Sequence, residues 1–178
     1  MSKDFFAKLP KVPSFEVMSK DIKDGEAFAL PQYSGMFGVQ GGQDISPQLS
    51  WRGAPQGTKS YAVTIYDLDA PTGAGFWHWA VANIPANVTD LPTGAGDNSG
   101  SELPKGAIQL PNDARAARFI GAAPPVGHGE HTYVITVYAL DVEDIGVSPD
   151  ATPTFLGFNM SGHTLARAVM IAKAEIKQ

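Results

Sequence analysis

The sequence contains no cysteine among its 178 residues. This absence excludes disulfide bridges, thiolate metal ligands and a cysteine nucleophile, and it fits a reducing compartment. Long apolar runs are also missing: none approaches the roughly eighteen residues that a membrane-spanning helix needs. The first residues carry charges at Asp4 and Lys8 and lack the apolar core of a signal peptide. We therefore expect a cytoplasmic protein without a membrane span.

Clusters of basic residues are missing as well. The chain has 13 Lys and Arg against 18 Asp and Glu, which gives a formal net charge of −5. A nucleic-acid groove or a polybasic membrane patch needs locally concentrated positive charge. We expect no nucleic-acid partner.

Glycine and proline are plentiful, with 19 and 14 residues spread along the chain between apolar segments. This distribution predicts many turns and loops on a β scaffold, because disorder would require fewer apolar residues than the 43% present here. The length predicts one domain over residues 1–178, with an irregular lead-in over 1–13.

Alternating β-branched and aromatic residues predict a strand at 60–66. A nearly continuous apolar run predicts a second strand at 76–84, buried on both faces, and a third strand is expected at 132–140. A short first strand is expected at 15–17. The connecting segments are predicted from their Gly and Pro content: a loop over 37–47, a mostly irregular connection over 85–113, and a rigid extended corner over 119–125.

The C-terminal region carries the predicted helices. A short helical turn is expected over 153–158. Leu165, Val169, Ala172 and Ile176 recur at helical spacing, which predicts a helix over 163–177 with one apolar face packed on a sheet.

The chain has four histidines, and His78 lies inside the apolar strand segment 76–84. Strand geometry predicts that Trp77 and Trp79 point to the opposite face. A titratable ring in such surroundings needs a polar partner. His78 is therefore either a hydrogen-bonded core histidine or a binding residue.

Two carboxylates, Asp67 and Asp69, follow the first strong strand two residues apart. They either contribute to a polar site or bond their own backbone in a turn before Pro71. After a Pro124-Pro125 pair and two glycines, His131 and Tyr133 alternate onto one face of the third strand. Imidazole and phenol groups beside backbone N–H groups favour binding of phosphate or carboxylate.

Taken together and in order, these segments resemble the phosphatidylethanolamine-binding protein family, most of all its bacterial Raf-kinase-inhibitor-like (YbhB/YbcL-type) branch. The resemblance rests on Asp67-Leu-Asp-Ala-Pro71, Phe76-Trp-His-Trp-Ala-Val-Ala-Asn-Ile-Pro85 and Gly121-Ala-Ala-Pro-Pro125 followed by His131-Thr-Tyr133, and it extends over residues 14–176.

The resemblance implies a mainly β fold, in which a large central antiparallel sheet packs on a smaller sheet, with a C-terminal helix. It also implies a small pocket for phosphate, phosphoryl-ethanolamine or acetate, without a cofactor or a metal. Carried over residue by residue, the pocket residues are Asp67, Asp69, His78, Ala123, Pro125, His131 and Tyr133.

Three positions depart from the family pattern. Leu68 replaces a proline, which frees a φ angle and restores an N–H. Ala122 and Ala123 replace a Pro-Cys pair, which removes rigidity and a thiol. An asparagine ahead of Ser46 is matched only loosely, by Gln43 or Asp44.

The binding hypothesis is electrostatic and non-catalytic. A carboxylate of Asp67 or Asp69 would accept from His78 and turn its other N–H toward an anion, while His131 and Tyr133 donate from the opposite wall. Three alternatives stay open: a module that reads a phosphorylated or acidic group on a kinase or protease partner, a weak hydrolase, and a His-carboxylate metal site. The family resemblance also implies a homodimer.

Overall fold

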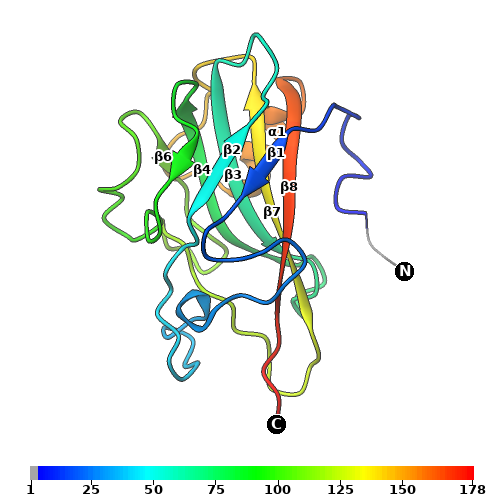
Figure 1. Ribbon diagram of the computed structural model, residues 1–178, viewed down its shortest axis with the longest axis vertical. Helices are drawn as coiled ribbons and strands as arrows, with labels where there is room; N and C mark the ends of the chain where they lie inside the picture. Colours follow the sequence, from blue (N-terminus) through cyan, green and yellow to red (C-terminus); the bar gives the residue numbers. More distant parts are fainter. Residues whose placement is uncertain (1–3) are drawn as a thin grey trace.

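The computed structural model describes residues 4–178, whose strands form two antiparallel sheets (Figure 1). The larger sheet has five strands in the order β6-β4-β3-β7-β8, with bounds Ile108–Gln109, Phe76–Pro85, Ser60–Asp67, His131–Leu140 and Thr164–Ala174. The smaller sheet has the order β1-β2-β5, with bounds Glu16–Met18, Leu49–Arg52 and Asp90–Leu91. The helical elements are the 3-10 turn η1 (Leu30–Gln32) and the helix α1 (Pro153–Met160).

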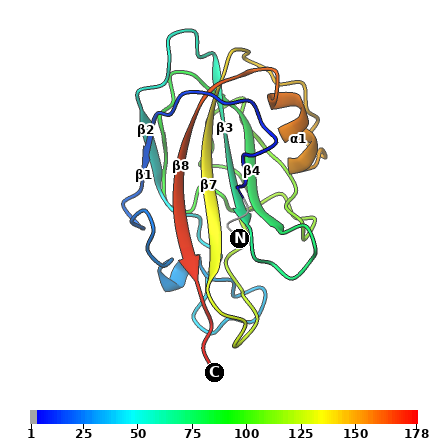
Figure 2. The same cartoon turned by 90° about the vertical axis from the view of Figure 1, so that its right-hand side faces the viewer.

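The small sheet covers one face of the large sheet, and α1 lies against the other face (Figures 1 and 2). The main core fills the space between the sheets and includes Trp51 of β2, Ile65 of β3 and Ile135 of β7. A second core lies under α1, where Leu156 packs with Ala80 and other small residues of the large sheet. Alternating side chains on β3 and β7 thus serve both cores, as strand geometry requires.

The three main strands predicted from the sequence are confirmed as β3, β4 and β7, with bounds that differ by at most one residue. The first short strand is confirmed as β1, one residue further along. Most of residues 85–113 is irregular, with β5 and β6 as two-residue strands inside it. The mainly β class with two packed sheets is therefore confirmed.

The prediction of a helix over residues 163–177 is wrong. The single α-helix toward the C-terminus is α1, where a helical turn was expected, and the following segment forms β8, which pairs with β7 along its length. Buried residues occupy every second position of β8: Ala166, Ala168, Met170, Ala172 and Ala174. The segment thus carries both a helical spacing of its larger residues and an alternation of its small ones. It forms a strand because pairing with β7 overrides the local helix propensity. Within residues 4–178 no helix is long and apolar enough to cross a membrane.

The antiparallel order brings three strand ends together at the end of the large sheet nearest the C-terminus. Asp67 closes β3 and lies opposite both Phe76, at the start of β4, and Tyr133, near the start of β7. Segments around η1 and after residue 119 run across this end of the sheet (Figure 1).

Candidate functional site

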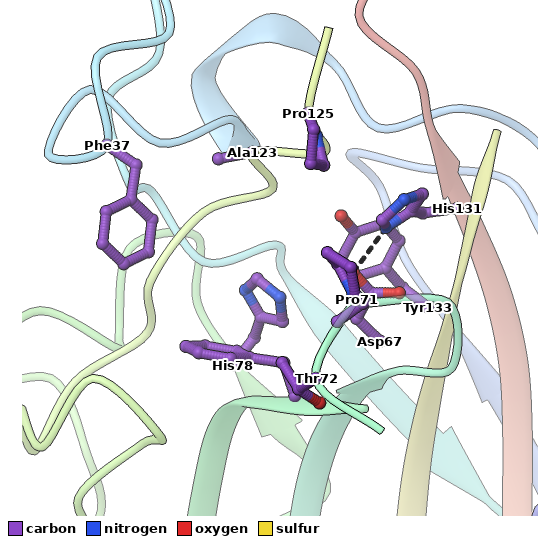
Figure 3. Close-up of a pocket in the computed structure, with 11 residues that line it drawn as sticks. Phe37, Asp67, Pro71, Thr72, His78, Ala123, Pro125, His131 and Tyr133 are labelled. Atoms are coloured by element: carbon purple, nitrogen blue, oxygen red, sulfur yellow. Dashed lines mark hydrogen bonds and ion pairs between the residues drawn. The ribbon is translucent and has the colours of Figure 1, made fainter. Parts of the chain in front are cut away.

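A cavity of about 220 Å³ opens at this end of the large sheet (Figure 3). Six of the seven residues expected from the family resemblance line it: Asp67, His78, Ala123, Pro125, His131 and Tyr133. The seventh, Asp69, does not line the cavity. Its Oδ2 accepts the backbone N–H of Thr132 at 2.7 Å and so ties the turn after β3 to β7.

Asp67 and His131 form a buried pair in the cavity wall. His131 Nδ1 lies 2.8 Å from Asp67 Oδ2, and the two side chains are 2% and 5% exposed. A carboxylate only accepts, so Nδ1 carries the proton in this bond. The other Asp67 oxygen accepts the backbone N–H of Asp69 at 2.8 Å, in the turn geometry considered from the sequence. Asp67 therefore orients His131 and also closes the turn.

His128 contacts the remaining ring nitrogen of His131, and sequence reasoning missed this contact. His128 Nδ1 lies 2.7 Å from His131 Nε2, so one proton lies between them. Either a neutral His128 donates to His131, or a protonated His131 donates to His128. Because His128 is exposed, the buried Asp67–His131 pair is linked to the surface through it.

A β-bulge sets the position of His78. On β4, Trp77 pairs with Tyr66 and Trp79 pairs with Ile65, which leaves His78 between them without a partner on β3. Such an extra residue re-aims side chains at a strand end. Trp77 lies on the outer face against Tyr66, whereas Trp79 joins the core between the sheets. The prediction that both tryptophans oppose His78 is therefore wrong for Trp79.

The hydrogen-bond partner of His78 also differs from the hypothesis. Its Nδ1 lies 2.8 Å from the carbonyl oxygen of Ile120, and no carboxylate bonds to the ring. Burial lowers the pKa of His78, while the Ile120 carbonyl and the charges of Asp67 and Asp113 act in the opposite direction. The ring is 5% exposed, so burial dominates and the neutral form is favoured.

Tyr133 presents an unused donor in the cavity. Its side chain is 1% exposed, and its hydroxyl has no hydrogen-bond partner among the described residues. Burial and the nearby charge of Asp67 raise the pKa of Tyr133 well above its usual value, so the phenol stays protonated. Buried hydroxyl groups without a partner are rare and require an explanation.

Five residues that were not expected in the pocket complete its rim and walls. They are Phe37, Ala70, Pro71, Thr72 and Phe76. Phe37 comes from the glycine-rich loop. The buried carboxylate of Asp44 holds that loop in place, because it accepts the N–H groups of Met36 and Gly121 at 3.0 and 2.8 Å. Of the two candidates ahead of Ser46, Asp44 is the one whose side chain makes these bonds.

Two departures from the family pattern have structural consequences. The N–H restored at Leu68 donates to the carbonyl of Thr132 at 2.9 Å and extends the contact between the ends of β3 and β7. The N–H at Ala122 donates to the carbonyl of Gln32 at 3.0 Å. Proline could make neither bond, so hydrogen bonds replace the rigidity that the proline rings would supply.

No group of three or more His, Asp or Glu side chains within residues 4–178 is arranged to hold a metal ion. The cavity instead combines one buried histidine–carboxylate pair, one neutral imidazole and one phenol with mostly apolar walls. Such a site can bind a small polar group by hydrogen bonds.

Comparison with known proteins agrees with this architecture. Residues 18–175 match the family model described as phosphatidylethanolamine-binding protein. The chain is 46% identical to YbcL of Escherichia coli K12 over 92% of its own length and 89% of that protein, and 43% identical to YbhB of the same organism over 88% and 98%. The crystal structure of E. coli YbcL, described as a new member of the mammalian PEBP family, superposes with a TM-score of 0.88 at 45% identity and covers 92% of this chain and 99% of that one. The chain therefore belongs to the phosphatidylethanolamine-binding protein family, in the branch of YbcL and YbhB.

Proposed function

We propose that the cavity binds a small oxyanion, such as phosphate, the phosphoryl group of phosphoryl-ethanolamine, or acetate, and that the protein does so without catalysing a reaction. The observation that carries the proposal is the buried Tyr133 hydroxyl, a donor without a protein partner in a cavity shared with His78 and His131. An oxyanion supplies the missing acceptor. A cytoplasmic location and a homodimer stay predictions.

The size of the cavity favours a small ligand. Its volume of about 220 Å³ corresponds to about seven water molecules and lies below the range of about 300–1,000 Å³ typical of drug-sized ligands. Charge-assisted hydrogen bonds contribute about 1.5–3 kcal/mol each. A few of them predict a dissociation constant of roughly 1 μM to 1 mM.

Titration of the protein with phosphate and phosphoryl-ethanolamine, followed by calorimetry or amide chemical shifts, tests the proposal. Ala123→Leu fills the cavity without touching its polar groups, and we expect it to abolish binding. Ala117→Leu changes an exposed alanine of the same connection and serves as the matched control. If neither anion binds to the wild type, or if Ala123→Leu binds like the control, the proposal is wrong.

A second candidate function is recognition of an acidic or phosphorylated segment on a partner protein, such as a kinase or a protease. Phe37 and Val126 favour it, because they are 52% and 61% exposed and line a groove that shares Phe37, Ala123 and Pro125 with the cavity. Val39→Ala combined with Val126→Ala changes two residues that line the groove but not the cavity. This variant would then weaken binding of a phosphopeptide and leave phosphate binding unchanged. Equal effects on both ligands would exclude this function.

A further inference from the structure

The hydrogen bond of His78 decides which of its ring nitrogens is a donor. Nδ1 lies 2.8 Å from the Ile120 carbonyl oxygen, which can only accept, so Nδ1 carries a proton. In the neutral ring Nε2 then has a lone pair and no hydrogen. No hydrogen bond within residues 4–178 uses this nitrogen, and Figure 3 shows the ring standing in the cavity. Neutral His78 therefore offers the cavity an acceptor.

The surroundings of the ring keep it neutral. It lies between the aromatic rings of Phe76 and Tyr133, at centroid distances of 4.9 and 5.1 Å. The charged or titratable groups near it are Asp67 at the end of β3, His131 and Tyr133 on β7, and Asp113 in the connection after β6. The two carboxylates favour a proton on His78, but burial acts against it more strongly and lowers its pKa.

The other polar groups of the cavity determine which further hydrogen bonds a ligand can make. The Tyr133 hydroxyl is a donor without a hydrogen-bond partner among the described residues, and each oxygen of the neighbouring Asp67 carboxylate already accepts one bond, from Asp69 N–H or from His131. A fully deprotonated anion would place its lone pairs against His78 Nε2 and its charge near the Asp67 carboxylate. An anion that keeps one O–H group satisfies both sides, because it donates to Nε2 and accepts from Tyr133.

We propose, as an extension of the proposed oxyanion site, that the pocket binds its ligand in a proton-bearing form, as the monoanion of a phosphate monoester whose P–OH donates to His78 Nε2. The proton of this hydrogen bond comes with the ligand. The pocket then selects phosphate over sulfate, and monoesters over diesters, because sulfate and phosphodiesters have no O–H to donate at neutral pH.

The decisive experiment compares ligands that differ only in acidity. Methylphosphonate and its more acidic difluoromethyl analogue are titrated from acid to alkaline pH, together with sulfate and a phosphodiester. We expect the affinity for each phosphonate to fall above the second pKa of that ligand, so that the midpoint shifts with the ligand. We expect sulfate and the diester to bind at least about tenfold more weakly than methylphosphonate, the factor for one lost bond.

A pair of variants tests the role of the residue itself. His78→Gln supplies an amide that both donates and accepts, so the preference for methylphosphonate over sulfate should shrink to within about threefold. His163→Gln changes an exposed histidine bonded to Asp141, outside the cavity, and should leave the preference intact. The wild-type ligand series decides the question even if His78→Gln does not fold.

The outcomes separate this inference from the proposed function. If sulfate binds as tightly as methylphosphonate, or if the midpoint is the same for both phosphonates, the oxyanion site stands and the requirement for a ligand proton is refuted. If no oxyanion binds, both proposals fail.

Discussion

Removal of the Tyr133 hydroxyl should separate stability from binding. The side chain is 1% exposed, and its ring packs edge-on against Phe28 and His78 at centroid distances of 5.2 and 5.1 Å. Tyr133→Phe keeps these contacts and deletes only an oxygen atom that has no partner among the described residues. The change is therefore a direct test of what that hydroxyl does.

The expected effect on stability is neutral to favourable. A buried polar group without a hydrogen bond costs about 1–3 kcal/mol, so Tyr133→Phe should unfold with an unchanged free energy or with one raised by up to about 2 kcal/mol. For a chain of 178 residues, a gain of about 2 kcal/mol raises Tm by roughly 4–8 °C.

The expected effect on binding has the opposite sign. The phenol would donate a charge-assisted hydrogen bond to the anion, and such bonds contribute about 1.5–3 kcal/mol. Its loss weakens phosphate binding about 10- to 150-fold. Residues of a binding site often lower the stability of the fold while they contribute to ligand affinity. Tyr133 is expected to behave in this way.

Urea denaturation measures the first effect, and calorimetric titration with phosphate in a slightly acidic buffer measures the second. Tyr61→Phe is the matched control, because Tyr61 is also buried in the core between the sheets but packs against Trp51, away from the cavity. It should not change phosphate affinity. If Tyr133→Phe loses 1 kcal/mol or more (about the value of one satisfied hydrogen bond), or binds phosphate like the wild type, the reasoning is refuted.

Two further predictions concern the fold around the site. Gly121→Ala should lower the free energy of unfolding by about 2–3 kcal/mol, because a Cβ there would lie 2.3 Å from the backbone of Tyr33. In the matched variant Gly157→Ala, inside α1, the added Cβ meets no atom within 4 Å, and the free energy of unfolding should rise by about 0.5–1 kcal/mol. Equal urea midpoints for the two variants would contradict both estimates. His78 takes up a proton at about pH 6.5 when unfolded, whereas burial lowers its folded pKa. The unfolded state therefore binds more protons below about pH 6.5, and the free energy of unfolding decreases as the pH is lowered, by up to about 1.4 kcal/mol per unit. The difference in unfolding free energy between the wild type and His78→Gln should therefore depend on pH below that value and be constant above it, and parallel curves throughout would show that His78 titrates alike in both states.

The strands that the sequence predicts best are those rich in β-branched and aromatic residues. In β3 the apolar and β-branched side chains leave no competing period, and its bounds were predicted to within one residue. In β8 four of the five inward residues are alanines, which favour helices, and Leu165 and Val169 happen to recur at helical spacing. Small residues give a weak alternation signal, so the pairing with β7 could not be read locally.

The composition of the cavity was accessible from sequence, but the roles of its polar groups were not. The order of the motifs along the chain suggested the family resemblance, and the resemblance predicted that Asp67, His78 and His131 share one pocket. The pairing of Asp67 with His131 joins residues 64 positions apart, and the sequence offered His78 as an equally reasonable partner. The bulge that turns His78 into the cavity depends on the register between β3 and β4, which no local pattern specifies.

The acceptor character of His78 follows from such a long-range contact. The Ile120 carbonyl that fixes its protonated nitrogen lies 42 positions away, on a segment held by the bond from Gly121 N–H to the buried carboxylate of Asp44. A histidine in an aromatic strand is compatible with donor and acceptor roles alike. The acceptor role follows only when the Asp44–Gly121 bond, the Ile120 carbonyl and the bulge in β4 are considered together. With this role, the proposed site is no longer a pocket for any anion but one that requires a proton on its ligand.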